Sequence, residues 1–364
     1  MEPFKNMYNR EFVGRLASEL GGVYSQFDSR EFVSSVIDEE WESRELKGRM
    51  RHISKTMGLY LPSDFEEAIE IVRRAAMGFE GGSFVAMVFP DFVEVYGLEH
   101  WEAAMAALEQ FTHQSSAEFA IRPFLLRDLE RGMAQMLEWA GHESDHVRRL
   151  ASEGCRPRLP WGMGVPALKR NPGLILPILE MLKGDESEYV RRSVANNLND
   201  IAKDHPELVV SVLGEWKIVG SKEMGKLVRH SLRGLLKQGH PGALELVGHG
   251  ATECVVEGLR VIDSVVKMGD SVEFEFAVVN LGSAAVDLMV DYVVGFVLAR
   301  GKSGKKVFKL SKFSLGAGER RSVRKVHSFR LITTRVYYPG VHSVAVQVNG
   351  VASGAVEFEL VESD

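Results

Sequence analysis

The amino-acid sequence predicts two domains of different class, an all-α domain over residues 1–250 and an all-β domain over residues 251–364. Two observations support this division. Amphipathic stretches and a repeated sequence block run through the first part, whereas short alternating stretches separated by Gly and Asn turns fill the second. The length of 364 residues agrees, because a single hydrophobic core seldom extends over so long a chain.

Seven amphipathic stretches in the first 140 residues are expected to form helices. Residues typical of a helix start support them: Asp64 precedes Phe65, and Glu66 and Glu67 follow where carboxylates complement the positive end of the helix dipole. Paired glycines such as Gly21-Gly22 interrupt the pattern as turns would. The expected helices lie near residues 9–20, 28–38, 42–58, 64–76, 84–97, 99–113 and 118–139.

A sequence block then recurs at a spacing of about 40 residues. The block SDHVRR at 144–149 returns 43 residues later as SEYVRR at 187–192. A third copy, KLVRH at 226–230, has its Val-Arg pair a further 38 residues along. A weaker copy, AEFAIR, lies at 117–122. This period is typical of helical hairpins whose inner helices line one concave surface. We therefore predict an all-α, HEAT-like helical-repeat solenoid.

The last third of the chain is expected to be a β-sandwich. Its short alternating stretches are separated by turn residues such as Asn349-Gly350, which is typical of sandwich domains. The Cys-Trp-Cys core of antibody domains is absent, so the prediction of an immunoglobulin-like β-sandwich concerns architecture alone. The expected strands lie at 272–279, 286–298, 305–310, 321–330, 342–348 and 354–361.

The net charge of −6 is distributed unevenly. Residues 1–144 contain 14 Lys and Arg against 25 Asp and Glu, a net of −11, whereas residues 145–240 contain 16 against 11, a net of +5. Residues 300–335 contain 12 basic residues and one acid. A polyanion would be repelled by the first region and attracted by the other two. The alternative is that the basic runs are simply solvated surface.

Several classes of protein are disfavoured. Cys155 and Cys254 lie far apart, so neither a disulfide framework nor zinc-type spacing is present. The start, MEPFKNMYNREF, lacks a basic segment followed by an apolar run, so we expect no signal peptide. No stretch of about 18 uninterrupted apolar residues predicts a membrane span. We expect a cytoplasmic monomer that has no membrane contact, metal or cofactor.

The arginines of the repeat share one face of each inner helix. Val147 and Leu150 fall on the opposite face, where they suit the core. A row of guanidinium groups suits a phosphate backbone, because each binds phosphate oxygens bidentately. Alternatively, such arginines pair with acids of the neighbouring repeat and only hold the stack together. The candidate phosphate-binding residues are Arg148, Arg149, Arg156, Arg158, Arg191, Arg192, Arg229 and Arg233.

The segment ASEGCRPRLPWG at 151–162 is the most unusual of the chain. Pro157 and Pro160 end the preceding helix, so Trp161 is expected on a loop. A loop tryptophan beside arginines can stack on a sugar or base, although it could also plug the core. Cys155 is expected to be a small apolar filler, because it has no evident histidine partner.

Three acids on the same predicted surface are candidates for catalysis: Glu118, Glu153 and Asp200. Cleavage of a glycosidic bond passes through an oxocarbenium-like state, and a nearby carboxylate stabilises that positive charge or activates water. Together with Trp161 they form the candidate catalytic set. Each acid could instead serve only as an ion-pair partner of an arginine.

These segments together resemble the AlkC branch of the AlkC/AlkD superfamily of DNA alkylation repair glycosylases. They cover the helical 250 residues, and the segment 151–161 is the most specific. The matching stretches are EPFKN at 2–6, ELKGRMRHI at 45–53, EFAIRPF at 118–124, ASEGCRPRLPW at 151–161 and VRRSVANNLND at 190–200.

The resemblance implies that alkylated double-stranded DNA is the substrate and that cationic bases such as 3-methyladenine and 3-methylcytosine are excised in base excision repair. It also implies that the lesion need not be swung into a pocket, unlike the substrates of most glycosylases. Glu153 and Trp161 match the family's active-site segment, and Glu118 and Asp200 match acidic positions on the same face. Arg148, Arg149 and Arg156 match the basic lining.

Two other functions remain open from the sequence. A non-catalytic HEAT-repeat scaffold would bind protein partners and would not need the residues around Glu153 and Trp161. A DNA-binding protein without catalysis would hold damaged DNA but release no base. The preferred lesion, the carboxylate that acts on water and the role of the β domain are left undetermined.

Overall fold

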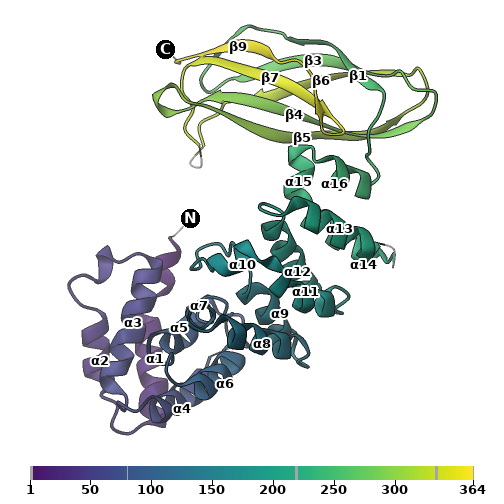
Figure 1. Cartoon of the computed structure of the whole chain (residues 1–364). Helices are drawn as coiled ribbons and strands as arrows, with labels where there is room; N and C mark the ends of the chain where they lie inside the picture. Colours follow the sequence, from purple (N-terminus) through teal and green to yellow (C-terminus); the bar gives the residue numbers. More distant parts are fainter. Residues whose placement is uncertain (1–2, 80, 218–219, 333–334, 364) are drawn as a thin grey trace. The chain divides into compact units, whose positions relative to one another are not determined.

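The computed structural model describes residues 3–79, 81–217, 220–332 and 335–363. The chain divides into two compact units, which we call unit 1, Met1–Asp204, and unit 2, His205–Asp364 (Figure 1). Unit 1 is helical, and unit 2 combines four further helices with all the strands. The predicted fold class, helical repeats followed by an immunoglobulin-like domain, is confirmed. Glu2, the first residue of one matching stretch, lies outside the described residues.

Unit 1 is a succession of α-helices with short 3₁₀ turns between some of them. The α-helices are α1 (Arg10–Val23), α2 (Ser29–Val36), α3 (Leu46–Tyr60), α4 (Phe65–Ala76), α5 (Val88–Tyr96), α6 (Trp101–Phe111), α7 (Arg122–Arg127), α8 (Leu129–Ala140), α9 (Asp145–Gly154), α10 (Pro166–Arg170), α11 (Leu176–Leu182) and α12 (Glu188–Ile201). The 3₁₀ turns are Phe4–Met7, Trp41–Ser43, Phe84–Met87 and Pro172–Leu174.

The helix starts follow from local side-chain chemistry. The Asp64 carboxylate accepts a hydrogen bond from the backbone N–H of Glu67 at 3.0 Å and thereby caps α4. One prediction was wrong, because the expected helix at 118–139 is two helices, α7 and α8. Asp128 separates them: its backbone is extended, and its carboxylate accepts from the N–H of Arg131 at 3.0 Å. An aspartate that caps a new helix ends the preceding one.

The repeated block corresponds to two helices of unit 1 that pack against each other, α9 and α12. Ser144 and Ser187 precede them with nearly the same extended backbone, φ −78° in both. Val147 and Val190 then occupy equivalent, fully buried positions. The third copy corresponds to α14, which belongs to unit 2. The predicted helical phase is therefore correct for the apolar residues.

Unit 2 begins with the helices α13 (Pro206–Lys217), α14 (Lys222–Ser231), α15 (Arg233–Gln238) and α16 (Pro241–Leu246). The strands are β1 (Cys254–Val261), β2 (Val265–Lys267), β3 (Ser271–Asn280), β4 (Val286–Val297), β5 (Ser303–Leu315), β6 (Arg320–Ser328), β7 (Gly340–Val348), β8 (Val351–Ala352) and β9 (Val356–Val361), with a 3₁₀ turn at Ala299–Gly301.

The strands form two sheets that enclose one apolar core. One sheet has the order β1-β3-β6, and the other has the order β2-β9-β7-β4-β5, with β8 paired to β7. Alternate residues such as Phe274 on β3 and Val294 on β4 are fully buried between the sheets. The sequence pattern missed β1, because Gly258 and a register shift between Glu257 and Arg260 interrupt its alternation.

Strand β5 is longer than expected and contains an irregularity. Val290 of β4 pairs with Ser311, but the next residue, Asp291, pairs with Lys309. Leu310 is therefore an extra residue, a β-bulge in β5.

No helix among the described residues is both long and apolar enough to cross a bilayer.

Candidate functional site

The buried arginine Arg122, at the start of α7, holds the segment that follows α9. Its side chain has no exposed surface. One terminal nitrogen donates to the carbonyl oxygens of Gly154 and Arg156, at 2.8 and 3.0 Å, and Nε donates to that of Met163. Burial lowers the pKa of Arg122 to about 10, so the group remains a cation at neutral pH. Arg122 thus fixes both ends of the loop between residues 154 and 163.

Trp161 lies at the outer end of this loop. Its side chain is 69% exposed, and its backbone is left-handed, with φ +63°. A residue with a side chain adopts that conformation only where its surroundings hold it. Lys47 on α3 does so, because its Nζ donates to the Trp161 carbonyl oxygen at 2.5 Å and lies 4.2 Å from the centre of the Phe119 ring. The tryptophan is therefore presented to solvent and does not plug the core.

The three predicted acids meet in a group of ion pairs, which we call the acid–arginine cluster. Glu153 is at its centre and is buried. Its Oε1 accepts from Arg156 at 2.5 Å and lies 3.5 Å from Arg149, and its Oε2 accepts from Ser193 Oγ of α12 at 2.6 Å. Two guanidinium groups and a hydroxyl thus stabilise this carboxylate.

The two arginines extend the cluster in opposite directions. Arg156 donates through Nε to Asp200 at 2.8 Å, while Lys203 donates to the other oxygen of Asp200 at 2.9 Å. Arg149 hydrogen-bonds Glu118 and lies 5.0 Å from the Tyr189 ring centre. The exposed fraction of the acidic side chains falls from 14% for Glu118 to 5% for Glu153 and 2% for Asp200. Glu118 therefore lies nearest to solvent.

The other arginines of unit 1 are engaged to different degrees. Arg148 is bound bidentately by Asp185 at 2.6 and 3.0 Å, and Arg191 donates to the carbonyl oxygens of Asp185 and Glu186. This arrangement favours a structural role for both, as it does for the buried Arg156. Arg158 pairs with Asp204 and Arg192 with Glu188, and their side chains keep 37% and 63% of their surface exposed. These two remain accessible to an incoming anion.

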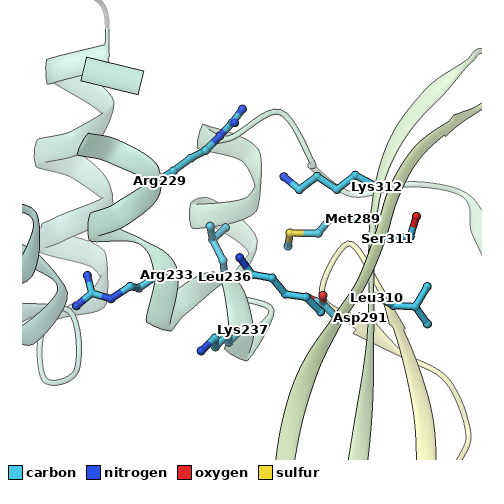
Figure 2. A pocket seen from close by; sticks show the side chains of 10 residues that line it. Arg229, Arg233, Leu236, Lys237, Met289, Asp291, Leu310, Ser311 and Lys312 are labelled. Atoms are coloured by element: carbon cyan, nitrogen blue, oxygen red, sulfur yellow. The ribbon is translucent and has the colours of Figure 1, made fainter. Parts of the chain in front are cut away.

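Arg229 and Arg233 belong to unit 2. They line a cavity together with residues of β4 and β5, and they form no part of the acid–arginine cluster. Figure 2 shows them on the helical side of that cavity. The predicted phosphate-binding arginines therefore lie on two separate units of the chain.

A cavity of about 300 Å³ adjoins Trp161. Its walls include Lys47, Arg51, Asp91 and Phe119. Burial raises the pKa of Asp91 to about 6, although Arg51, 2.9 Å away, opposes this shift. The sequence did not single out Lys47, Asp91 or Arg122. Lys47 and Arg122 do fall inside the matching stretches at 45–53 and 118–124. Their partners, however, lie far away in the sequence, as Trp161 does from Lys47, so no local sequence pattern indicates these contacts.

Cys155, which ends α9, is the small buried filler that the sequence predicted. It has no exposed surface, and burial raises the pKa of its thiol to about 12. Asn197 donates to its sulfur at 3.4 Å. Within the described ranges, no three His, Cys, Asp or Glu side chains are grouped so as to hold a metal ion.

Comparison with known proteins reveals similarity over nearly the whole chain. Residues 84–231 match the family described as DNA alkylation repair enzyme, and residues 255–362 match the C-terminal Ig-like domain of the uncharacterised protein YhaZ. The chain is 41% identical over 362 residues to YhaZ of Bacillus subtilis strain 168, covering 99% of this chain and 100% of that protein.

A solved structure is equally similar. It is that of the Pseudomonas fluorescens alkylpurine DNA glycosylase AlkC bound to DNA containing an abasic site analog. The identity is 40%, the TM-score is 0.92, and the match covers 99% of this chain and 100% of that chain. The two similar proteins each match 99% of this chain, so both the helices and the strands have counterparts in them.

Proposed function

Because the chain belongs to the AlkC family of DNA alkylation repair enzymes, we propose that it is a DNA glycosylase that acts in base excision repair. It hydrolyses the N-glycosidic bond of cationic N-alkylated bases, such as 3-methyladenine and 3-methylcytosine, in double-stranded DNA. The observation that carries this proposal is the acid–arginine cluster, which adjoins the Arg122-held loop that presents Trp161.

The proposed role of the cluster is electrostatic. When the alkylated base departs, positive charge develops on the deoxyribose, and a fixed carboxylate stabilises it. Glu153 is held by Arg156, Arg149 and Ser193, so it needs no reorganisation as the charge appears. Glu118, the most exposed of the three acids, is placed to meet the sugar or its attacking water. Asp200 positions Arg156 from the far side.

The proposed role of Trp161 is to pack against the deoxyribose of the damaged nucleotide. An exposed indole held at the tip of a fixed loop offers a flat apolar surface for this contact. The lesion's own positive charge already weakens its glycosidic bond, so modest stabilisation suffices. The base therefore need not be swung out of the duplex. Arg158 and Arg192 are the proposed phosphate contacts of unit 1, since both remain partly exposed.

Release of free methylated base from methylated duplex DNA tests this function. We expect release by the wild-type chain and a fall of about 100-fold with Glu153→Gln, because one fixed charge at the reacting centre is removed. Glu130→Gln is the matched control, since Glu130 is an exposed acid on α8 outside the cluster, and it should keep the wild-type rate. Trp161→Ala should lower the rate more than the DNA affinity.

The same assay separates the alternatives. DNA binding without base release by the wild-type chain would indicate a DNA-binding protein without catalysis. Neither binding nor release would indicate a scaffold for protein partners. Full activity of Glu153→Gln would refute the role of the cluster while leaving the glycosylase itself intact.

A further inference from the structure

The cavity of about 300 Å³ beside Trp161, which we call the Trp161 cavity, has no part in the electrostatic role proposed for the acid–arginine cluster. Its walls come from three segments of unit 1, namely α3, α5 and the loop that follows α9, with Phe119 as a further wall residue. None of the three cluster acids lines it. Its volume is at the small end of the range for ligand sites, which suits one or two rings rather than a nucleotide.

Asp91 on α5 is the unusual member of this lining. Its side chain is 1% exposed, and in the part of the chain that the structure describes neither carboxylate oxygen accepts a hydrogen bond. Arg51 forms an ion pair with it at 2.9 Å, but the hydrogen bond of that guanidinium goes to Glu94. The hydroxyl of Ser54, another neighbour, donates to two backbone carbonyl oxygens at 3.2 Å. Buried polar atoms without a hydrogen-bond partner are rare, so this carboxylate has the capacity to accept from a ligand.

Aromatic and thioether side chains form the rest of the cavity wall. The rings belong to Trp161 and Phe119, and the thioethers belong to Met50 and Met163. The Phe119 ring already carries Lys47 Nζ at 4.2 Å, whereas the Trp161 indole is largely exposed. A flat, conjugated molecule can therefore stack on the indole while its edge reaches a hydrogen-bond acceptor.

The charges of the lining balance one another. Lys47 and Arg51 are the cations, and the acids are Asp91 and Glu94, so the cavity has no excess of positive charge to hold a phosphate. Both acids share Arg51, and Lys47 Nζ donates to the Trp161 carbonyl oxygen at 2.5 Å. These features disfavour a nucleotide and favour an uncharged heterocycle that carries N–H donors.

A molecule of this kind is formed in the proposed reaction. When the bond between the sugar carbon and the base nitrogen breaks, its electron pair stays on the nitrogen and cancels the positive charge of the methylated base. The positive charge passes to the deoxyribose, where water adds and releases a proton. The base therefore leaves as an uncharged, flat heterocycle, and 3-methyladenine carries an amino group that can donate a hydrogen bond.

We propose that the Trp161 cavity receives the excised base, which stacks on Trp161 and donates its amino hydrogen to Asp91. The proposal rests on the proposed function and adds a binding site for the product of the reaction. Trp161 lines the cavity and is also the residue proposed to pack against the deoxyribose, so the departing base needs to move past only one side chain. The base enters after the bond has broken, so no nucleotide has to be flipped out of the duplex.

The test measures binding of free 3-methyladenine to the full-length protein by calorimetry, with dAMP as a second probe. Asp91→Ala removes the acceptor, and Glu130→Ala is the matched control because Glu130 is an exposed acid outside the cavity. Trp161→Ala removes the stacking surface at an exposed position, so it keeps the test valid if Asp91→Ala does not fold. Thermal unfolding shows which variants are folded.

The wild-type chain and Glu130→Ala should bind 3-methyladenine equally. Asp91→Ala and Trp161→Ala should each bind it at least about 10-fold more weakly, as expected for the loss of a hydrogen bond to a charged group or of a stacked ring. Asp91→Asn keeps one carbonyl acceptor and should bind with intermediate affinity. Binding of dAMP should be absent, because the lining has no excess positive charge.

Three results would overturn the proposal: no binding of 3-methyladenine by the wild-type chain, equal binding by the folded variants and the control, or binding of dAMP as tight as that of the base. Base release from methylated duplex DNA is measured separately. Release by a chain that binds no free 3-methyladenine refutes only the site. Binding that depends on Asp91, without release from DNA, refutes only the glycosylase.

Discussion

Substitution of Lys47 by methionine should slow catalysis while leaving the fold stable. Lys47 makes one hydrogen bond that bears on the site, from Nζ to the Trp161 carbonyl oxygen at 2.5 Å. A hydrogen bond from a charged donor contributes about 1.5–3 kcal/mol. The left-handed backbone of Trp161 costs about 1–3 kcal/mol. The free energy of the hydrogen bond is therefore similar in size to the backbone strain that it offsets.

The rate should therefore fall about 10- to 100-fold, because the loop no longer favours the conformation that presents the indole. Stability should change by less than about 1 kcal/mol, since Lys47 is exposed and methionine keeps the apolar part of its side chain. Partial burial lowers the pKa of Lys47, because it disfavours the charged ammonium group. Removing that charge should therefore not destabilise the fold. The effect should appear in turnover more than in DNA affinity.

The assay is single-turnover release of 3-methyladenine from duplex DNA, together with DNA affinity by anisotropy and thermal unfolding. Lys55→Met is the matched control, because Lys55 is an exposed lysine of the same helix and its loss removes the same charge. A rate for Lys47→Met equal to that of Lys55→Met, in a folded protein, would show that Trp161 does not need this hydrogen bond.

Three further predictions concern buried groups. The folded pKa of Asp91, about 6, exceeds the ordinary value of 3.8, so its contribution to stability is fully present below pH 3.8 and is lost as the pH rises through 6. Unfolding of Asp91→Asn in urea should therefore show a gain over wild type that grows by about 2 kcal/mol between pH 4 and 7. Gly154→Ala should lower the free energy of unfolding by about 1–3 kcal/mol, because the new Cβ would lie 2.8 Å from Ile121 Cγ2. In the native chain a thiol reagent should modify Cys254 and spare the fully buried Cys155, which should react only after unfolding.

Each of these has a clear contrary result. A stability difference between Asp91→Asn and wild type that stays constant with pH would mean that the carboxyl is ionised in the folded chain throughout. Gly184→Ala is the control for the glycine, because its added Cβ would meet nothing within 4 Å. Rapid modification of both thiols in the native protein would contradict the packing around α9.

The candidate functional segments were visible in the sequence for a physical reason. Prolines at 157 and 160 cannot continue a helix, so the position of Trp161 on a loop followed from local backbone chemistry. The helical phase of the block at 144–149 predicted the burial of Val147, and in the copy at 187–192 the equivalent Val190 is also buried. The break at Asp128 was missed because an aspartate that caps a new helix cannot be distinguished, in the sequence alone, from an aspartate within a continuous helix.

Periodicity and neighbouring residues were enough to predict that helices precede strands, which faces are apolar, and that acids and arginines lie near Trp161, although the helix break at Asp128 and the interrupted strand β1 were missed. Which charges meet depends instead on the tertiary structure. Lys47 and Trp161 are 114 positions apart, and Arg156 meets Asp200 across 44. It also decided that Lys309 and Lys312 share a face, since the bulge at Leu310 arises from pairing with β4. Such partners are chosen by packing between elements, which no local pattern encodes.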